Sequence, residues 1–226
     1  MKNQAVILAQ GAYPSHPYPL QVLHEAAMLV CTDGAVNNLK GREPDIVVGD
    51  LDSLSDRMKK RYASRLVLNT DQDTNDLTKA VQLCHEKGIR AVTILGAAGL
   101  REDHMLGNIS LLGDYARMME KVRMVTDYGT FWAYTDKTSP TSGFTGFSLR
   151  CIKGNPVSFF GLDPALELKV IGVQYPVENV VFDALWKATL NTCTGNRLEV
   201  QFRNGPLLIY MIHPAIFQEA PDIWEE

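Results

Sequence analysis

The sequence lacks most of the features that mark secreted, zinc-binding or membrane-spanning chains. Its four cysteines are far apart and form no CxxC pair: Cys31, Cys84, Cys151 and Cys193. Zinc-finger spacing and a disulfide framework are both absent, so we expect four reduced, mostly buried thiols. No apolar run approaches the roughly 18 residues of a membrane span. The first one, Ala5 to Ala9, is also too short for a signal-peptide core. We therefore expect a cytoplasmic protein without a membrane partner.

Positive charge is not in excess either. The 226 residues include 22 Lys and Arg against 26 Asp and Glu, which gives a net charge of −4. An acidic chain has no general attraction for nucleic acid, so we expect no nucleic-acid partner. A hydrophobic content of 46% is ordinary for a globular protein and suffices for a core without disulfides or structural metal.

The first half alternates strand-like and helix-like segments. Short apolar runs at 4–9, 28–32, 46–48, 66–68, 91–95 and 122–125 predict strands, and helical spacing predicts helices at 20–29, 55–63, 73–86 and 103–118. Such alternation predicts an α/β domain with a mostly parallel, Rossmann-like sheet. We assign residues 1–130 to this domain and expect it to bind nucleotide and metal.

The second half loses that alternation. Residues 138–146 are rich in turn formers, and short β-favouring runs follow at 147–151, 157–160, 166–173, 180–182, 197–202 and 207–212. Their spacing of about eight to twelve residues predicts an all-β sandwich over residues 131–226.

Acidic residues follow the strand predicted at 46–48. Side chains alternate along a strand, so Asp50 and Asp52 point the same way, with Cα atoms roughly 6.5 Å apart. Two like charges at one place repel unless a cation or a proton intervenes, and Mg²⁺ bound to phosphate would fit. The alternative is an ordinary turn or helix cap.

A second acidic cluster opens the helix predicted at 73–86. Asp71, Asp73 and Asp76 fall within six residues, and Lys79 follows Asp76 by one helical turn. Acids in a first turn complement the helix dipole, which is the simplest explanation. The other explanation is that Asp76 is a metal ligand beside a lysine that binds phosphate.

Glycines and an arginine follow the strand predicted at 91–95. Gly96 and Gly99 would let the backbone approach a ligand, and Arg101 could bind phosphate. Walker-type and GxGxxG signatures are absent, so each loop alone is a weak signal. Several successive strand-end loops with acids, glycines or Arg together predict a metal and polyphosphate site. A nucleotide-dependent transferase or a phosphohydrolase would carry such a site.

The motifs as a set resemble the thiamine pyrophosphokinase family. They are Asp33-Gly34-Ala35-x-Asn37, Gly49-Asp50-Leu51-Asp52-Ser53, Asp71-Gln72-Asp73-x-x-Asp76-x-x-Lys79-Ala80 and Gly96-x-x-Gly99-x-Arg101-x-Asp103-His104. In the second half, Gly172 to Pro176 and Thr194-Gly195-Asn196 match more loosely. The resemblance implies an α/β domain followed by a β-sandwich. It also implies a magnesium-dependent homodimer that converts thiamine and ATP to thiamine diphosphate and AMP.

The resemblance also implies a role for each matched residue. Asp50, Asp52 and Asp76 would hold magnesium, with Asp73 close by, and Lys79 and Arg101 would neutralise phosphate charge. Nucleotide-side contacts would come from Asp33, Gly34, Asn37, Ser53, Gly99, Arg101, Asp103 and His104. Tyr175 would stack on the thiamine ring and Asn196 would hydrogen-bond its aminopyrimidine. Nucleotide residues of one subunit would meet vitamin-binding residues of the partner.

Three positions depart from the family pattern. Asn75 stands in place of Thr, Gln174 in place of Lys, and Gly195 in place of the Ser before Asn196. The changes at Gln174 and Gly195 leave the identity of the acceptor substrate open. The alternatives are a diphosphokinase for another alcohol such as a pterin, a metal-dependent phosphohydrolase, and a sensor without catalytic activity.

Overall fold

The computed structural model describes residues 3–136 and 143–213, and the chain separates into two compact units, Met1–Asp127 and Tyr128–Glu226. Most of the turn-rich segment expected at 138–146 lies outside the described residues. No helix within 3–136 or 143–213 combines the length and the apolar character needed to cross a membrane.

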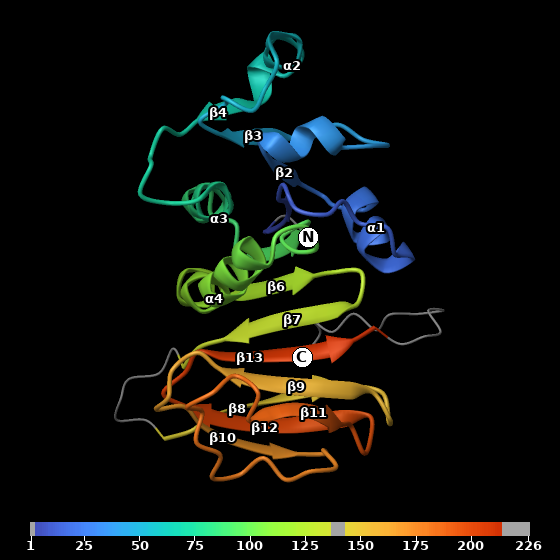
Figure 1. The fold of residues 1–226 in the computed structure, drawn as a ribbon, viewed down its shortest axis with the longest axis vertical. Coiled ribbons are helices and arrows are strands. Elements are labelled where there is room, and N and C mark those ends of the chain that lie inside the picture. The colour runs from blue at the N-terminus through green and yellow to red at the C-terminus, as the bar shows by residue number, and fades with distance from the viewer. Residues whose placement is uncertain (1–2, 137–142, 214–226) are drawn as a thin grey trace. The chain divides into compact units, whose positions relative to one another are not determined.

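The first unit is built on six parallel strands, β1 (Gln4–Leu8), β2 (Leu29–Thr32), β3 (Ile46–Gly49), β4 (Leu66–Leu68), β5 (Ala91–Leu95) and β6 (Lys121–Val125). Their order is β6-β5-β1-β2-β3-β4, and every neighbouring pair is parallel (Figure 1). The expected parallel α/β arrangement is therefore confirmed here. β1 is a topological switch point, because β2 and β5 lie on its two sides.

The helices of this unit are α1 (Pro17–His24), α2 (Asp56–Arg61), α3 (Asp76–Glu86) and α4 (Glu102–Met118), with short 3-10 turns at Gly34–Asn38 and Ala63–Arg65. α3 and α4 lie side by side (Figure 1). The predicted apolar stripe of α3 is buried, as expected. α3 begins three residues later than predicted, because the Asn75 side chain caps it by accepting the N–H of Thr78 at 2.8 Å.

The helix predicted at 20–29 is misplaced at both ends. α1 begins at Pro17, a residue suited to a first turn because it lacks an N–H, and it ends at His24. Arg42 fixes the end of the helix, since its guanidinium donates to the carbonyls of Leu23 and Ala26 at 3.1 and 2.8 Å. The chain is thereby free to enter β2 at Leu29.

Within residues 128–136 and 143–213, the second unit contains two antiparallel arrays of strands. One has the order β11-β9-β13-β7, from β7 (Gly129–Tyr134), β9 (Pro156–Gly161), β11 (Ala188–Thr192) and β13 (Leu207–Ile212). The other has the order β10-β12-β8, from β8 (Thr145–Arg150), β10 (Glu167–Ile171) and β12 (Arg197–Arg203). One cluster of buried side chains draws on both arrays. The all-β composition is as expected, whereas the sandwich and the Rossmann-like label for the first unit stay predictions.

The strand predicted at 180–182 is wrong. Those residues lie outside every strand, although Phe182 is buried. Phe182 packs over Gly161, where an added Cβ would lie 2.8 Å from its ring, so its burial comes from packing and not from a strand ladder. β7 and β11 are strands that the pattern missed.

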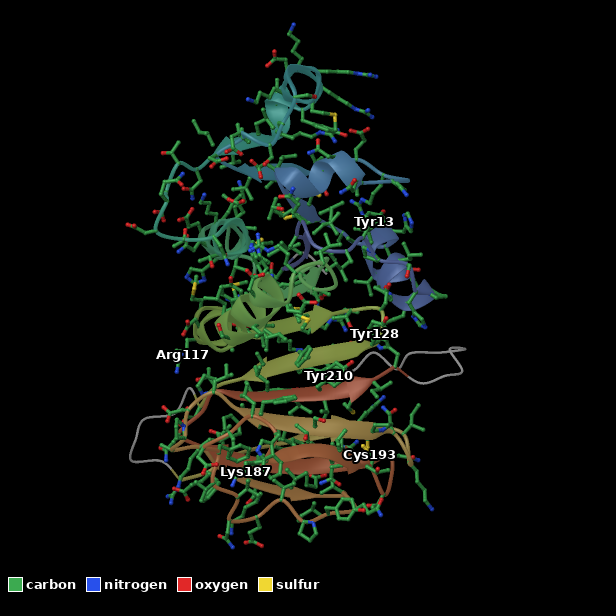
Figure 2. All side chains as sticks on the ribbon, viewed as in Figure 1. Tyr13, Arg117, Tyr128, Lys187, Cys193 and Tyr210 are labelled. Atoms are coloured by element: carbon green, nitrogen blue, oxygen red, sulfur yellow. The ribbon has the colours of Figure 1, made fainter. Side chains whose placement is uncertain are left out.

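The four cysteines are free thiols, and three of them are buried. Burial raises the pKa of Cys31 and Cys84 to about 12, which keeps both thiols neutral. Cys193 lies in the second unit (Figure 2). The expectation of reduced, mostly buried cysteines is confirmed.

Candidate functional site

The parallel sheet of the first unit places the predicted site residues at one edge. Asp33 follows β2, Asp50 follows β3, and Gly96 follows β5. The carboxyl ends of parallel strands meet at one edge of a sheet, so chain segments that are far apart in sequence converge there. Ligands of open α/β sheets bind at this edge, near the switch point.

Three carboxylates gather at this edge. Asp33, Asp50 and Asp52, which we call the acid group, each offer an oxygen within 4.8 Å of the others. Asp33 is buried, Asp50 is half-buried and Asp52 is exposed. A carboxylate set of this kind suits a hard divalent cation such as Mg²⁺, which prefers oxygen ligands and keeps part of its water shell.

Asp33 is held entirely by backbone groups. Its Oδ1 accepts the N–H of Gly34 at 2.7 Å, and its Oδ2 accepts the N–H of Leu51 at 2.9 Å. Burial raises the pKa of the Asp33 carboxyl, and the charges of nearby Asp76 and Asp50 raise it further. The two backbone hydrogen bonds lower it, but they do not offset this rise. Asp33 therefore belongs to the acid group as well as to the 3-10 turn that follows it.

The other two acids share a tight turn. Asp50 Oδ1 accepts the N–H of Asp52 at 3.1 Å, and this hydrogen bond holds the pKa of Asp50 below its usual value. Ser53 donates its hydroxyl to Asp52 at 3.1 Å. Asn37 donates from Nδ2 to the carbonyl of Ser53 at 3.1 Å, so it supports the loop from the side.

The first turn of α3 brings an acid and a lysine together. Lys79 Nζ lies 3.1 Å from Asp76 Oδ1, and the Lys79 side chain is only 3% exposed against 41% for Asp76. A buried ammonium is rare unless it is paired, so this ion pair differs from an ordinary surface contact. Asp76 is not a member of the acid group, although its charge reaches Asp33.

The loop before α3 is exposed. Asp71 accepts the N–H of Asp73 at 2.9 Å and the hydroxyl of Thr74 at 3.0 Å, and these bonds lower the pKa of Asp71. The Asp73 carboxylate is exposed. The loop is thus ordered by Asp71, which sequence reasoning noted only as one acid among three.

The glycine-rich loop after β5 is tied to the loop after β1. Gly11 N–H donates to the carbonyl of Gly96 at 2.6 Å, and Ala12 N–H to that of Ala98 at 2.8 Å. Gly96 has φ +64°, and a Cβ on it would lie 2.5 Å from the Ala9 carbonyl, so only glycine fits. No sequence motif pointed to the loop after β1.

Arg101 and Asp103 form a pair at the start of α4. The guanidinium donates to Asp103 at 3.1 Å from Nε and at 2.5 Å from an NH2 nitrogen, and both side chains are exposed. Asp103 also accepts the N–H of His104 at 2.9 Å. His104 and Gly99 are exposed as well.

Tyr175 and Asn196 lie in the second unit. Tyr175 is 60% exposed, and its backbone is held by Asn191, which accepts the Tyr175 N–H at 3.0 Å and donates to the Tyr175 carbonyl at 2.7 Å. Asn196 is exposed, and its Oδ1 accepts the N–H of Lys153 at 3.4 Å. Sequence reasoning missed the buried Asn191, because it lies in β11, a strand that the pattern also missed.

The fold and the acid group together define the class of protein to which the first unit belongs. It is an α/β domain whose parallel sheet carries charged groups at its carboxyl edge, where acids, a buried lysine and a glycine-rich loop are found. Residues 20–126 match the family model described as "Thiamin pyrophosphokinase, catalytic domain". Over these residues the chain is similar to the thiamine pyrophosphokinase family.

Curated relatives align over part of the chain. Thiamin pyrophosphokinase 1 of Caenorhabditis elegans is 34% identical over 100 residues, which cover 39% of this chain and 41% of that protein. Thiamine pyrophosphokinase 3 of Oryza sativa is 32% identical over 114 residues, with 38% and 43% covered. The aligned segment thus spans about two fifths of the length of these relatives.

Solved structures share the fold over nearly the whole chain. Thiamine pyrophosphokinase from Bacillus subtilis has a TM-score of 0.74 at 22% identity, and the match covers 94% of this chain and all of that one. Yeast thiamin pyrophosphokinase has a TM-score of 0.71 at 16% identity, with 93% and 86% covered. At these identities the likeness concerns the fold, including the second unit, which the family model does not reach.

Proposed function

We propose that this protein transfers a diphosphoryl group from ATP to the hydroxyl of thiamine, giving thiamine diphosphate and AMP, in a magnesium-dependent reaction. The observation that carries the proposal is the acid group beside the Asp76–Lys79 pair, within the residues that match the family's catalytic domain. The sequence-derived expectations of a Rossmann-like first unit, a β-sandwich and a cytoplasmic location are part of the same proposal.

The acid group supplies the first part of the chemistry. Asp50 and Asp52 would hold Mg²⁺, with Asp76 predicted to join them, and the ion would neutralise charge on the phosphates of ATP when bound. Diphosphoryl transfer depends on positioning and charge neutralisation more than on covalent catalysis. Four carboxylates near one another would otherwise repel a polyphosphate.

Lys79 supplies a fixed positive charge. Its ammonium is buried and oriented by Asp76 at 3.1 Å, so little side-chain freedom is left to lose when a phosphate binds. Arg101 is exposed and would have to exchange its contacts with Asp103 for phosphate oxygens. We propose that Asn37, Ser53, Asp73, Gly99 and His104 line the nucleotide side.

The acceptor side is proposed for the second unit. The exposed Tyr175 ring offers a flat face for thiamine, and Asn196 an amide for its aminopyrimidine. Two observations favour a second candidate, a diphosphokinase for another alcohol. The open space around Gly195 is not filled by a serine hydroxyl, and Gln174 is exposed where the family has Lys. A homodimer in which each site draws on both subunits is also proposed.

One assay tests the proposal. AMP and thiamine diphosphate should form together when ATP, Mg²⁺ and thiamine are all present. AMP formation with a pterin alcohol but not with thiamine would support the second candidate. Inorganic phosphate or AMP formation without any acceptor would point to a phosphohydrolase, and no turnover of any kind to a sensor.

A pair of lysine variants makes the assay specific to the site. Lys79→Met removes the buried charge but keeps most of the length of the side chain, and Lys87→Met removes an exposed charge at the end of α3. We expect Lys79→Met to lose at least about 100-fold in turnover while it unfolds no more easily than the wild type. Lys87→Met should leave turnover unchanged.

A further inference from the structure

The loop that displays Asp50 and Asp52 is built on an unfavourable backbone conformation. Leu51, between them, has φ +66°, in the left-handed region that leucine rarely adopts because its Cβ approaches the following carbonyl oxygen. Such a conformation persists only where the surrounding structure enforces it. The direction in which Asp50 and Asp52 point therefore depends on what holds Leu51.

Asp33 is the side chain that holds it. Its Oδ2 accepts the Leu51 N–H at 2.9 Å, while its own N–H donates to the carbonyl of Val48 at 3.0 Å. Gly49 leaves room for the carboxylate, since a Cβ at that position would lie 2.7 Å from Asp33 Cγ. Asp33 is 1% exposed, and its other oxygen is bonded to Gly34 at 2.7 Å. Both oxygens thus serve backbone groups.

We propose that Asp33 is a positioning residue that fixes the left-handed turn at Leu51 and so aims Asp50 and Asp52 at one shared cation. Its contribution is made through the Leu51 amide and not by direct contact with nucleotide. A carboxylate is required because both oxygens must accept a hydrogen bond, which a single amide oxygen cannot do at both places. The use of the cation rests on the proposed function, whereas the tie to Leu51 does not.

The test variant is Asp33→Asn, which keeps the size of the side chain and removes one acceptor. Two quantities are measured: hydrogen exchange of the Leu51 amide by NMR, and binding of Mn²⁺ by the electron paramagnetic resonance signal of the free ion, with a non-cleavable ATP analogue present. We expect Leu51 exchange to become at least about tenfold faster and Mn²⁺ affinity to fall about tenfold, as for other residues that orient metal ligands.

Asp45→Asn is the matched control. Asp45 also accepts a backbone N–H, from Leu29 at 2.7 Å, but it precedes β3 and so lies at the opposite edge of the sheet. This variant should change neither Leu51 exchange nor Mn²⁺ affinity.

A rescue experiment separates a positioning role from a direct ligand. Leu51→Gly removes the penalty on the left-handed turn, so adding it to Asp33→Asn should recover about fivefold in Mn²⁺ affinity. Leu190→Gly, at an exposed leucine with φ +57° in the second unit, should recover nothing. If Asp33→Asn fails to fold, Gly49→Ala in the wild-type background displaces the same carboxylate, and the same two losses are expected.

The outcomes are distinct. Unchanged Leu51 exchange in Asp33→Asn, or faster exchange with unchanged Mn²⁺ affinity, would overturn the positioning role. Failure of Leu51→Gly to recover any affinity would instead make Asp33 a direct ligand. A wild-type protein that binds no Mn²⁺ with the nucleotide analogue would overturn the proposed function, and the exchange data would still decide whether Asp33 holds the turn.

Discussion

Asp52 is the exposed member of the acid group, so its carboxylate can meet a ligand without any rearrangement of the core. It lies beside two other carboxylates, and in the absence of a cation their charges repel. Its hydrogen bonds with Asp50 and Ser53 are local to the loop. A residue with these contacts contributes little to the free energy of folding, so its substitution should reduce activity more than stability.

Asp52→Asn is expected to abolish turnover almost completely while the melting temperature stays unchanged or rises, because repulsion within the acid group is relieved. Differential scanning calorimetry and the AMP assay measure the two effects. Asp163→Asn is the control, because Asp163 is likewise an exposed aspartate in a turn, where its carboxylate accepts the N–H of Ala165 at 2.9 Å. If Asp52 only shapes its turn, turnover survives and stability falls by about 1 kcal/mol.

Tyr175 gives the corresponding prediction for the acceptor. Tyr175→Ala should raise the KM for thiamine, with a loss of on the order of 1 kcal/mol or more in binding, and leave ATP binding near normal. The exposed ring makes few contacts that stability would need, so the melting temperature should hold. Steady-state kinetics with each substrate varied in turn provide the measurement. An equal loss of affinity for thiamine and for ATP, with a marked loss of stability, would contradict the role of Tyr175 in binding thiamine.

At the scale of elements, hydrogen bonds between the carboxyl-edge loops and the strand ends hold the loops in place. Asp127, after β6, accepts the N–H of Ser15 at 2.9 Å and of His16 at 3.0 Å, and the Ser15 hydroxyl at 2.5 Å. His16 caps α1, so this carboxylate fixes the loop after β1 and the start of α1 together. Burial opposes ionisation of Asp127, but these hydrogen bonds outweigh it and lower the pKa of its carboxyl.

The direction of that pKa shift predicts a pH dependence. A carboxyl whose pKa is lower in the folded state stabilises the fold above its unfolded pKa of about 3.9, and the contribution is lost as pH falls through the folded pKa. Asp127→Asn should therefore be less stable than the wild type by about 1 kcal/mol at neutral pH. The difference should shrink between about pH 5 and pH 2, as measured by urea denaturation at each pH. A difference that is constant with pH would contradict the ionised role of Asp127.

At the scale of the whole molecule, the sequence predicted the parts that depend on periodicity. The stripe from Leu77 to Cys84 identified α3, and strand-end acids predicted that Asp50 would lie at the carboxyl edge. The position of the Asp33 side chain could not be predicted, because this side chain, which follows β2, occupies space left by Gly49 on the neighbouring strand β3. β11 was missed because Leu190 and the buried Asn191 break its alternation at a bulge.

Subunit assembly is tested by complementation. If Asp52→Asn and Asn196→Ala each abolish turnover, their co-expression gives mixed dimers. In a shared site, one site of a mixed dimer carries both lesions and the other carries neither. With random pairing, half of the dimers are mixed and half of their sites are intact, so activity should recover to roughly a quarter of wild type. A mixed dimer isolated with two affinity tags and found inactive would exclude the shared site.

The tie between Gly11 and Gly96 has a consequence for anyone who wishes to redesign this protein. Two loops separated by more than eighty residues are joined backbone to backbone, with Ala12 and Ala98 forming the next contact. Substitutions or insertions in one loop will then have effects that depend on the other, so libraries that diversify a single loop should yield few folded members. Coupled libraries that keep Gly11 and Gly96 and vary residue 12 together with residues 97–99 are the ones we expect to yield new specificities.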